Sequence, residues 1–137
     1  MTKEQKIASF DPSQPGLSDA NIYGLPFTAE ECEIVVIPAP WEVTVSYGAG
    51  ASDGPLAIYE ASYQVDLLHQ NFPDLWKLGI HYDDFENNWK SQSDHYKKLA
   101  QPIIEALENG EDLGSIPALK NNLNEINAAC AQFNSEL

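Results

Sequence analysis

The chain has no arginine and few basic residues of any kind. Its 137 residues hold 7 Lys+Arg, all lysines, against 21 Asp+Glu, so the formal net charge is −14. No lysine occurs between Lys6 and Lys77. Nucleic-acid binding depends on clustered Lys and Arg that displace counterions from phosphates. Binding to an anionic membrane surface needs a similar cluster. The composition therefore argues against both kinds of partner.

Long apolar runs are also missing. The longest aliphatic run is Ile34 to Ile37, and Pro38 ends it, whereas a membrane-spanning helix needs about 20 mostly apolar residues. The first fifteen residues carry charges and no apolar core of a signal peptide. The only cysteines, Cys32 and Cys130, lie far apart and in no metal-ligand spacing. We therefore expect a cytoplasmic protein with free thiols.

The chain divides into a polar start and one α/β domain of typical size. Residues 1–21 are polar and contain Pro12, Pro15 and Gly16, which predicts a flexible amino-terminal arm before a domain over 22–137. The unalternating run at 32–37 predicts a strand covered on both faces of a parallel sheet. A Gly-rich loop follows over 39–53.

Two further elements complete this first half of the expected domain. A helix over roughly 55–63 is apolar on most sides, so we expect it to be well buried. Residues 77–81 predict a second strand.

The second half of the chain predicts two long helices. The first covers 88–108, and Pro102 should kink or split it. The second follows Ser115 as its cap, with Pro117 in the first turn. Its apolar residues recur at steps of four and three: Leu119, Leu123, Ile126, Cys130, Phe133 and Leu137. This stripe fits either a packing helix at a domain edge or a coiled-coil surface for a partner.

Two glycine motifs lie near the end of the loop over 39–53. Gly50-Ala-Ser52-Asp-Gly54 matches the G-x-S-x-G nucleophile elbow of α/β-hydrolases. Pro55 follows its second glycine and the chain is short for that fold, so an ordinary helix-entry turn is favoured. Gly48, Gly50 and Gly54 miss the dinucleotide fingerprint by one residue.

The histidines offer one weak metal candidate. His81-Tyr-Asp83-Asp84 places an imidazole and two carboxylates within four residues, which could bind a divalent cation. An exposed polar turn after a strand is the commoner interpretation. His69 and His95 each occur alone in polar surroundings and predict surface positions.

The loop after the first strand holds the residues most typical of a binding or interface site. In parallel sheets, ligands bind beyond the carboxyl ends of strands. A substrate-entrance or interface loop would use Trp41, Tyr47, Gly48, Gly50 and Asp53. The alternative, with about equal support, is that the two aromatic residues pack the loop onto its own domain.

A structural role is expected at the end of this loop. Gly54 and Pro55 predict a helix entry, with Pro55 in the first turn. Asp53 or Ser52 would cap the helix, and Gly54 would adopt a positive φ or pack against a neighbouring backbone.

Residues 34–67, IVVIPAPWEVTVSYGAGASDGPLAIYEASYQVDL, resemble the amino-terminal portion of the arginase/agmatinase (ureohydrolase) family. The shared elements are the strand 34–37, the glycine loop 46–52, Gly54-Pro55, and Glu60-Ala61-Ser62. A looser similarity extends over 22–137. Many family members carry basic residues after the Gly-Pro, where this chain has Leu56 and Tyr59. The resemblance therefore does not specify the substrate.

The resemblance implies the amino-terminal part of an αβα sandwich with a mostly parallel sheet. It also implies a parent hydrolase in which two Mn²⁺ ions activate a hydroxide that attacks a guanidino carbon. The family's metal motifs, Gly-Gly-Asp-His, Asp-x-His-x-Asp and Asp-x-Asp, are absent from this sequence. No catalytic or metal-ligating residue is therefore carried over, and we expect these residues to bind no cofactor themselves. The stripe that continues to Leu137 fits a helix cut through its length.

Two functional hypotheses follow. The first is the amino-terminal fragment of a ureohydrolase-like enzyme, which by itself is not catalytic. It would associate with the remainder of its parent chain or as a homo-oligomer. The second is a free-standing, acidic, non-catalytic interaction module that binds a partner through its acidic surface and the last helix.

Overall fold

The structure is a computed structural model that describes residues 1–16, 20–45, 47–83 and 88–137. It mixes helices with a two-stranded parallel sheet, which agrees with the expected α/β class in its coarse form. The chain forms two compact units. One comprises Met1–Pro38 and Pro55–Phe85, and the other comprises Ala39–Gly54 and Glu86–Leu137. Within the described ranges, no helix is long and apolar enough to cross a membrane.

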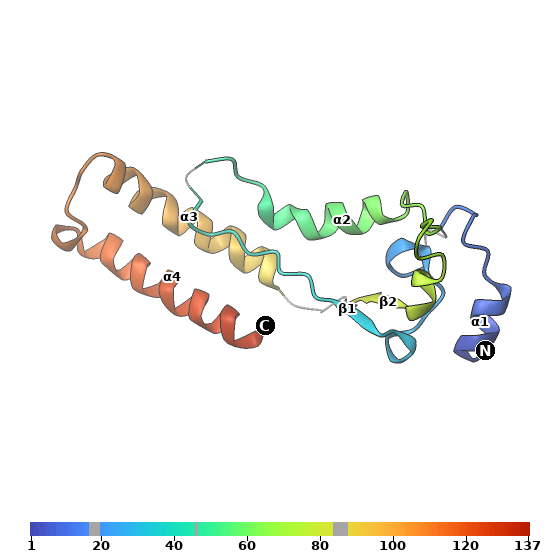
Figure 1. The fold of residues 1–137 in the computed structure, drawn as a ribbon. Coiled ribbons are helices and arrows are strands. Elements are labelled where there is room, and N and C mark those ends of the chain that lie inside the picture. Colours follow the sequence, from blue (N-terminus) through green and yellow to red (C-terminus); the bar gives the residue numbers. More distant parts are fainter. Residues whose placement is uncertain (17–19, 46, 84–87) are drawn as a thin grey trace. The chain divides into compact units, whose positions relative to one another are not determined.

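The first unit contains the sheet. The strands β1 (Ile34–Val36) and β2 (Ile80–Tyr82) run parallel, with Ile34 opposite Ile80 and Val36 opposite Tyr82. The helix α2 (Gly54–Ser62) lies between them in the sequence (Figure 1). The core of this unit consists of Leu25, Phe27 and Trp76. The predicted order of strand, helix and parallel strand is therefore present.

A short helix occupies part of the predicted arm. The helix α1 (Lys3–Ser9) begins with a capping box between Thr2 and Gln5. Phe10, which follows the helix, contacts the Trp76 ring with 5.1 Å between ring centroids. Sequence pattern alone missed this helix because its apolar contacts come from residues distant in the sequence.

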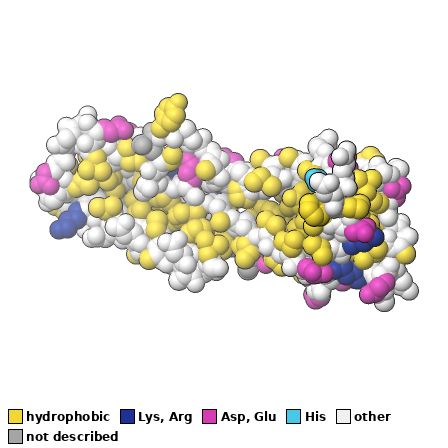
Figure 2. Space-filling view, viewed as in Figure 1, with side chains coloured by type: hydrophobic (Ala, Val, Ile, Leu, Met, Phe, Trp, Pro, Cys, Tyr) yellow, Lys and Arg dark blue, Asp and Glu magenta, His cyan; other side chains and the backbone are white. Residues whose placement is uncertain are grey.

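The burial expected for β1 and α2 is wrong. Ile34 and Val35 are 41% and 50% exposed, although a strand covered on both faces was predicted. In α2, Leu56 and Ile58 are 62% and 60% exposed, and Ser62 is its buried residue. Figure 2, in the same view as Figure 1, shows hydrophobic side chains at the molecular surface. The apolar composition agrees with a strand and a helix, but no element among the described residues covers these side chains.

The second strand begins later than predicted. Leu75–Leu78 forms a 3₁₀ helix, and β2 starts at Ile80. Gly79 between them has φ +77, and a Cβ at this position would lie 3.0 Å from the Cα of Cys32. The chain therefore turns at a residue where only glycine fits, and this turn delays the strand.

The second unit is built on a helical hairpin. The helices α3 (Trp89–Glu108) and α4 (Pro117–Glu136) lie side by side, joined through the 3₁₀ helix Leu113–Ser115 (Figure 1). Their core is formed by Val43, Ala100, Ile103 and Ile126. Pro102 lies inside α3 without splitting it. Ser115 belongs to the 3₁₀ helix and Ile116 precedes α4, so the cap prediction was wrong by one residue.

The apolar stripe of α4 faces its own unit. Ile126 and Phe133 are buried, and Leu119, Leu123 and Cys130 pack against the core cluster. Only the last member, Leu137, is exposed. The packing interpretation is therefore confirmed. The interpretation of this stripe as a partner surface is wrong, because α3 and the 41–43 segment already cover it.

Candidate functional site

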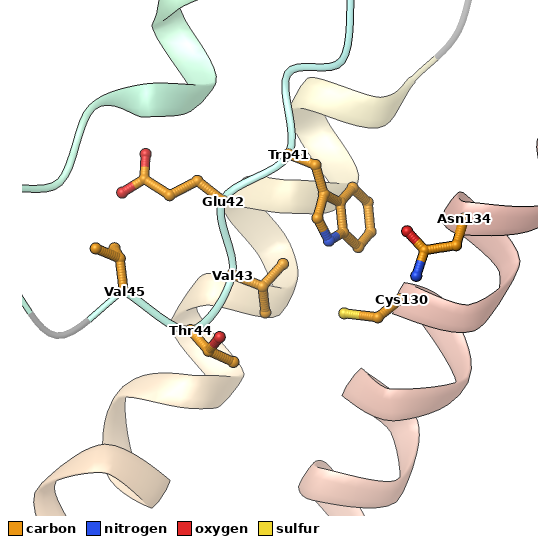
Figure 3. Close-up of a pocket in the computed structure, with 7 residues that line it drawn as sticks. All are labelled: Trp41, Glu42, Val43, Thr44, Val45, Cys130 and Asn134. Carbon is orange, nitrogen blue, oxygen red and sulfur yellow. The ribbon is translucent and has the colours of Figure 1, made fainter. Parts of the chain in front are cut away.

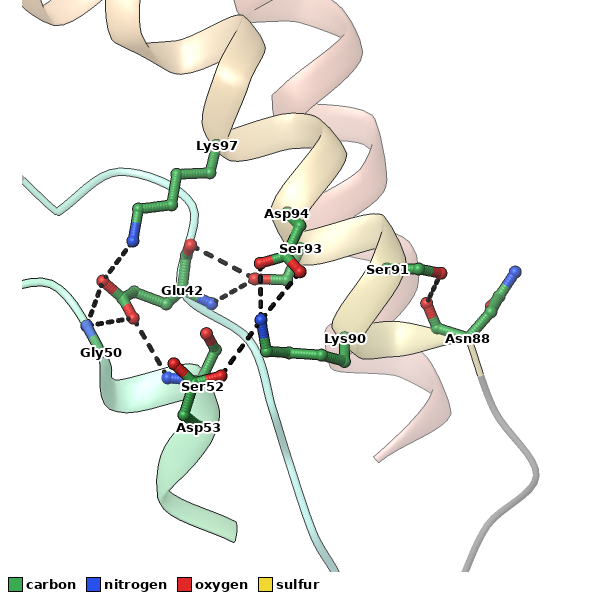
Figure 4. A network of polar contacts seen from close by, with 10 residues as sticks. All are labelled: Glu42, Gly50, Ser52, Asp53, Asn88, Lys90, Ser91, Ser93, Asp94 and Lys97. Atoms are coloured by element: carbon green, nitrogen blue, oxygen red, sulfur yellow. Dashed lines mark hydrogen bonds and ion pairs between the residues drawn. The ribbon is translucent and has the colours of Figure 1, made fainter. Parts of the chain in front are cut away.

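A buried carboxylate organises the loop that follows β1. The carboxylate of Glu42 accepts from the Gly50 N–H at 3.1 and 2.9 Å and from the Ser52 N–H at 3.1 Å. The Lys97 ammonium of α3 donates to it at 2.8 Å. Figure 4 shows these donors converging on one side chain. We call Glu42, Gly50, Ser52, Ser93 and Lys97 the Glu42 clamp.

Ser93 holds the backbone of the same residue. Its hydroxyl accepts from the Glu42 N–H at 2.7 Å and donates to the Glu42 carbonyl at 3.2 Å. Ser93 is fully buried in α3, so both hydrogen bonds are shielded from water. The side chain and the backbone of Glu42 are thus both fixed against the second unit's hairpin.

The clamp keeps Glu42 ionised. The hydrogen bond from Lys97, followed by those from the Ser52 and Gly50 N–H groups, lowers the pKa of Glu42 to about 2 from 4.5. Burial acts in the opposite direction, because it disfavours a charge, but it is outweighed. A carboxylate with so low a pKa is a poor general base near neutral pH. Its geometry suits anchoring of the loop.

A second ion-pair group lies next to the clamp. The Lys90 ammonium lies 2.7 Å from Asp94 and 3.2 Å from Asp53, and these carboxylates raise the pKa of Lys90 (Figure 4). Asp53 was predicted either to line an entrance or to cap the following helix. In the structure its carboxylate pairs with Lys90 on α3, so it ties the end of the loop to the hairpin.

The two predicted loop aromatics have opposite environments. The Trp41 ring stacks on Phe133 with 4.6 Å between centroids and lies 6.1 Å from the Tyr96 ring. Trp41 therefore packs the loop onto its own unit, as the structural alternative proposed. Tyr47 is 94% exposed, so it is available to a ligand or partner. Ser46, which begins the glycine loop of the resemblance, lies outside the described residues.

The loop glycines have conformations that explain their presence. Gly48 and Gly50 have φ values of +67 and +134, which residues with a side chain rarely adopt. The turn at Gly50 directs its N–H and that of Ser52 towards Glu42. Loop shape and clamp formation are therefore coupled at this residue.

The helix entry is partly as predicted. Pro55 is the second residue of α2, which confirms its position in the first turn. Gly54 has φ −55, and no atom beyond its chain neighbours lies near a Cβ built there, so the expected positive φ and close packing are both wrong. Gly54 instead adopts a helical conformation directly before proline, where a Cβ is disfavoured.

The open cavity at this loop is lined by Trp41, Glu42, Val43, Thr44, Val45, Cys130 and Asn134. Figure 3 shows Trp41, Cys130 and Asn134 facing one another, while the Glu42 carboxylate points away from them. Asn134 offers an amide and Cys130 a thiol. The lining brings no acid–base pair to the cavity.

The nucleophile elbow has no support in the geometry. Ser52 is buried in the 3₁₀ turn Ala51–Asp53, and its N–H is part of the Glu42 clamp. The only histidine of the second unit, His95, is exposed on α3 and contacts the Tyr96 ring. Ser52 is therefore a turn residue, which agrees with the favoured helix-entry interpretation.

The metal candidate at 81–84 is only partly described, because Asp84 lies outside the described residues. The His81 Nδ1 contacts the Asn21 side-chain amide. Within the described ranges, no group of three or more His, Cys, Asp and Glu side chains is placed to hold a metal ion. His69 is exposed and stacks on Phe72.

Sequence reasoning missed the residues of the clamp itself. No motif or spacing in the sequence assigned a role to Glu42, Ser93 or Lys97. The available signal was a single carboxylate between Trp41 and Val43, in a stretch that has no other charged residue before Asp53. A charge among apolar neighbours requires a partner, but the pattern does not say which of the lysines supplies it.

Comparison of the chain with protein-family models, with curated proteins and with solved structures gives no match.

Proposed function

We propose that this chain is the amino-terminal, non-catalytic part of a ureohydrolase-like hydrolase whose complete fold is an αβα sandwich. Support comes from the resemblance of residues 34–67 and from the order of elements in that stretch. The strand β1, a glycine loop and the helix α2 beginning at Gly54-Pro55 follow one another as the resemblance implies.

The observation that carries the proposal is the exposure of β1. Parallel strands in α/β proteins are normally covered on both faces and read as continuous aliphatic runs. The run Ile34–Ile37 has this composition, yet Ile34, Val35 and Ile37 are exposed. A sheet of two short strands is also too small for independent stability. The first unit thus has the surface expected of a sheet that continues in a larger domain.

Within that domain, the loop held by the Glu42 clamp would form part of the substrate entrance. The clamp fixes the base of the loop on α3, and Tyr47 extends from it into solvent. A loop that is anchored by a buried carboxylate and presents an exposed aromatic side chain suits contact with a substrate or neighbouring subunit.

The manganese site implied by the resemblance does not fit the described residues. Glu42 is occupied by its three donors, and no metal-binding group of His, Cys, Asp and Glu is found among the described side chains. We therefore assign no step of hydrolysis to this chain.

The decisive experiment is to determine the coding sequence that adjoins residue 137 in the messenger RNA. The proposal expects the frame to continue through Gly-Gly-Asp-His and Asp-x-His-x-Asp motifs. It also expects the longer product to release urea from a guanidino compound when Mn²⁺ is added. A stop codon at this point, with no such motifs encoded nearby, would contradict it.

The alternative is a free-standing interaction module, and the same exposed residues of β1 and α2 favour it. The apolar stripe of α4, which first suggested this function, packs against the core of its own unit. A stop codon together with stable capture of another protein by Ile34, Val35 or Leu56 would support the module instead.

A further inference from the structure

Among the described residues, no strand pairs with the edge of β1 that faces away from β2. The Ile34 N–H donates to the Gly79 carbonyl at 3.3 Å, and the Val36 carbonyl accepts from the Asp83 N–H at 3.0 Å. Both residues thus direct their backbone groups towards β2. Successive residues of a strand point these groups to opposite edges, so the N–H and C=O of Val35 point away from β2.

The far edge of β2 is already occupied. Tyr82 points away from β1, and its N–H donates to the Asn21 Oδ1 at 2.9 Å. The same oxygen accepts from the Ile22 N–H, so Asn21 is itself fixed beside β2. Further pairing of this sheet is therefore expected at β1.

The open edge lacks the usual protection against pairing. Natural edge strands carry lysines, inward-pointing charges or bulges that prevent association. Ile34, Val35 and Ile37 are instead 41%, 50% and 46% exposed, with no charged residue between Glu33 and Pro38. Pro38 cannot donate a hydrogen bond, so it limits pairing to the preceding residues.

Two of the acidic residues beside β1 have a lysine as neighbour. The Lys3 ammonium lies 3.8 Å from Glu33, and that of Lys6 lies 2.6 Å from Glu31. The helix α1 thus brings two of the chain's seven lysines to this edge. Repulsion between two copies at this site is weaker than the net charge of −14 suggests.

We propose that β1 pairs with β1 of a second copy of this chain, antiparallel and about a two-fold axis at Val35. This register places Val35 opposite Val35 and Ile34 opposite Val36 of the second copy. Glu33 then faces Ile37 without donating to it, because its N–H already donates to the Leu78 carbonyl at 3.0 Å. β-branched side chains face one another, which favours cross-strand packing, and no two carboxylates are opposed. The interface is self-complementary, as a two-fold dimer requires, and it joins two sheets into one of four strands. This inference goes beyond the proposed function, because it concerns the 137-residue chain itself.

Sedimentation equilibrium of the 137-residue chain tests the proposal with a matched pair of variants. Val35→Lys adds a charge at the open edge. Val65→Lys adds the same charge at a valine of nearly equal exposure, 52%, in the same unit but after α2. We expect a monomer–dimer equilibrium for the unsubstituted chain, about tenfold weaker for V35K and unchanged for V65K. Dimerisation should strengthen between about 0.05 and 0.3 M NaCl, because salt screens the net negative charge.

Circular dichroism tests whether V35K retains its fold. If V35K is unfolded, amide hydrogen exchange of the unsubstituted chain is measured in place of V35K sedimentation. The Val35 N–H should then be protected at concentrations where the dimer forms and exchange faster on dilution. A monomer at all concentrations, equal effects of V35K and V65K, or no concentration dependence of Val35 exchange would each overturn the proposal.

Discussion

Glu42 illustrates how a single charged residue can be structural. Its carboxylate receives two backbone N–H groups and one ammonium, and Ser93 holds its backbone. Each of these donors would lack a partner in the folded state if the carboxylate were removed, and buried donors without partners are costly. The residue therefore fixes the loop, while the loop's exposed Tyr47 remains available for contacts.

Replacing Glu42 with glutamine should lower stability in a pH-dependent way. The pKa of Glu42 in the folded protein, about 2, lies below its ordinary value of 4.5. Its ionised form therefore stabilises the fold above about pH 4.5, and this contribution is lost as the pH falls through about 2. In urea unfolding, E42Q should be less stable than the unsubstituted chain at pH 7. The difference should shrink between pH 4.5 and 2.

The matched control is Glu108→Gln, which changes an exposed carboxylate at the end of α3. Its effect should stay within about 0.5 kcal/mol at every pH. A difference between E42Q and the unsubstituted chain that is the same at pH 7 and pH 2 would show that the charge of Glu42 contributes nothing.

Gly54 allows a test of the steric clash between a Cβ at residue 54 and the ring of Pro55. Because it is helical directly before Pro55, Gly54→Ala should destabilise the fold by about 1 kcal/mol, although alanine normally favours helices. The cost should disappear when Pro55 is also replaced by alanine, since the clash needs both residues. A double-mutant cycle by urea unfolding measures this coupling. Additive effects of the two substitutions would argue against the pre-proline explanation.

At the scale of elements, the α3–α4 hairpin shows that the apolar stripe of α4 packs within its own unit. Its central residues meet Val43, Ala100 and Ile103 within their own unit. At the open end of the hairpin, where α3 begins and α4 ends, the Trp89 Nε1 donates to the Glu136 carboxylate at 3.0 Å. The stripe is therefore largely buried when the second unit folds.

Two substitutions within the stripe should differ sharply in cost. Ile126→Ala removes a side chain that is 1% exposed and should destabilise the chain by about 3 kcal/mol. Leu137→Ala truncates the exposed last residue and should change stability by less than about 0.5 kcal/mol. Both values come from thermal or urea unfolding. Equal effects at the two positions would mean that the hairpin does not pack as described.

At the scale of the whole molecule, the proposed function predicts that this chain by itself has no hydrolase activity. A two-metal hydrolase needs several carboxylate and imidazole ligands at a common site, and the described residues do not offer one. The 137-residue chain should therefore release no urea from arginine, agmatine or guanidine when Mn²⁺ is supplied. The assay should include a known arginase as positive control. Urea release that chelation abolishes would contradict the prediction.

Several features were determined by sequence alone because their causes are local. The composition of the 34–37 run, the glycine loop and Pro55 specify strand, turn and helix start from backbone preferences. The steps of three and four in α4 specify one apolar face. The position of Tyr47 in a glycine-rich loop identified it as a candidate contact residue.

Other features were decided only by the tertiary structure, because they depend on residues distant in the sequence. The helix α1 is stabilised by contacts with the Trp76 region, and Gly79 delays β2 because of Cys32. Glu42 is a loop anchor only because Lys97 and Ser93 of α3 lie beside it. Exposure of β1 and α2 likewise could not follow from composition, since an aliphatic run is buried only where other elements cover it.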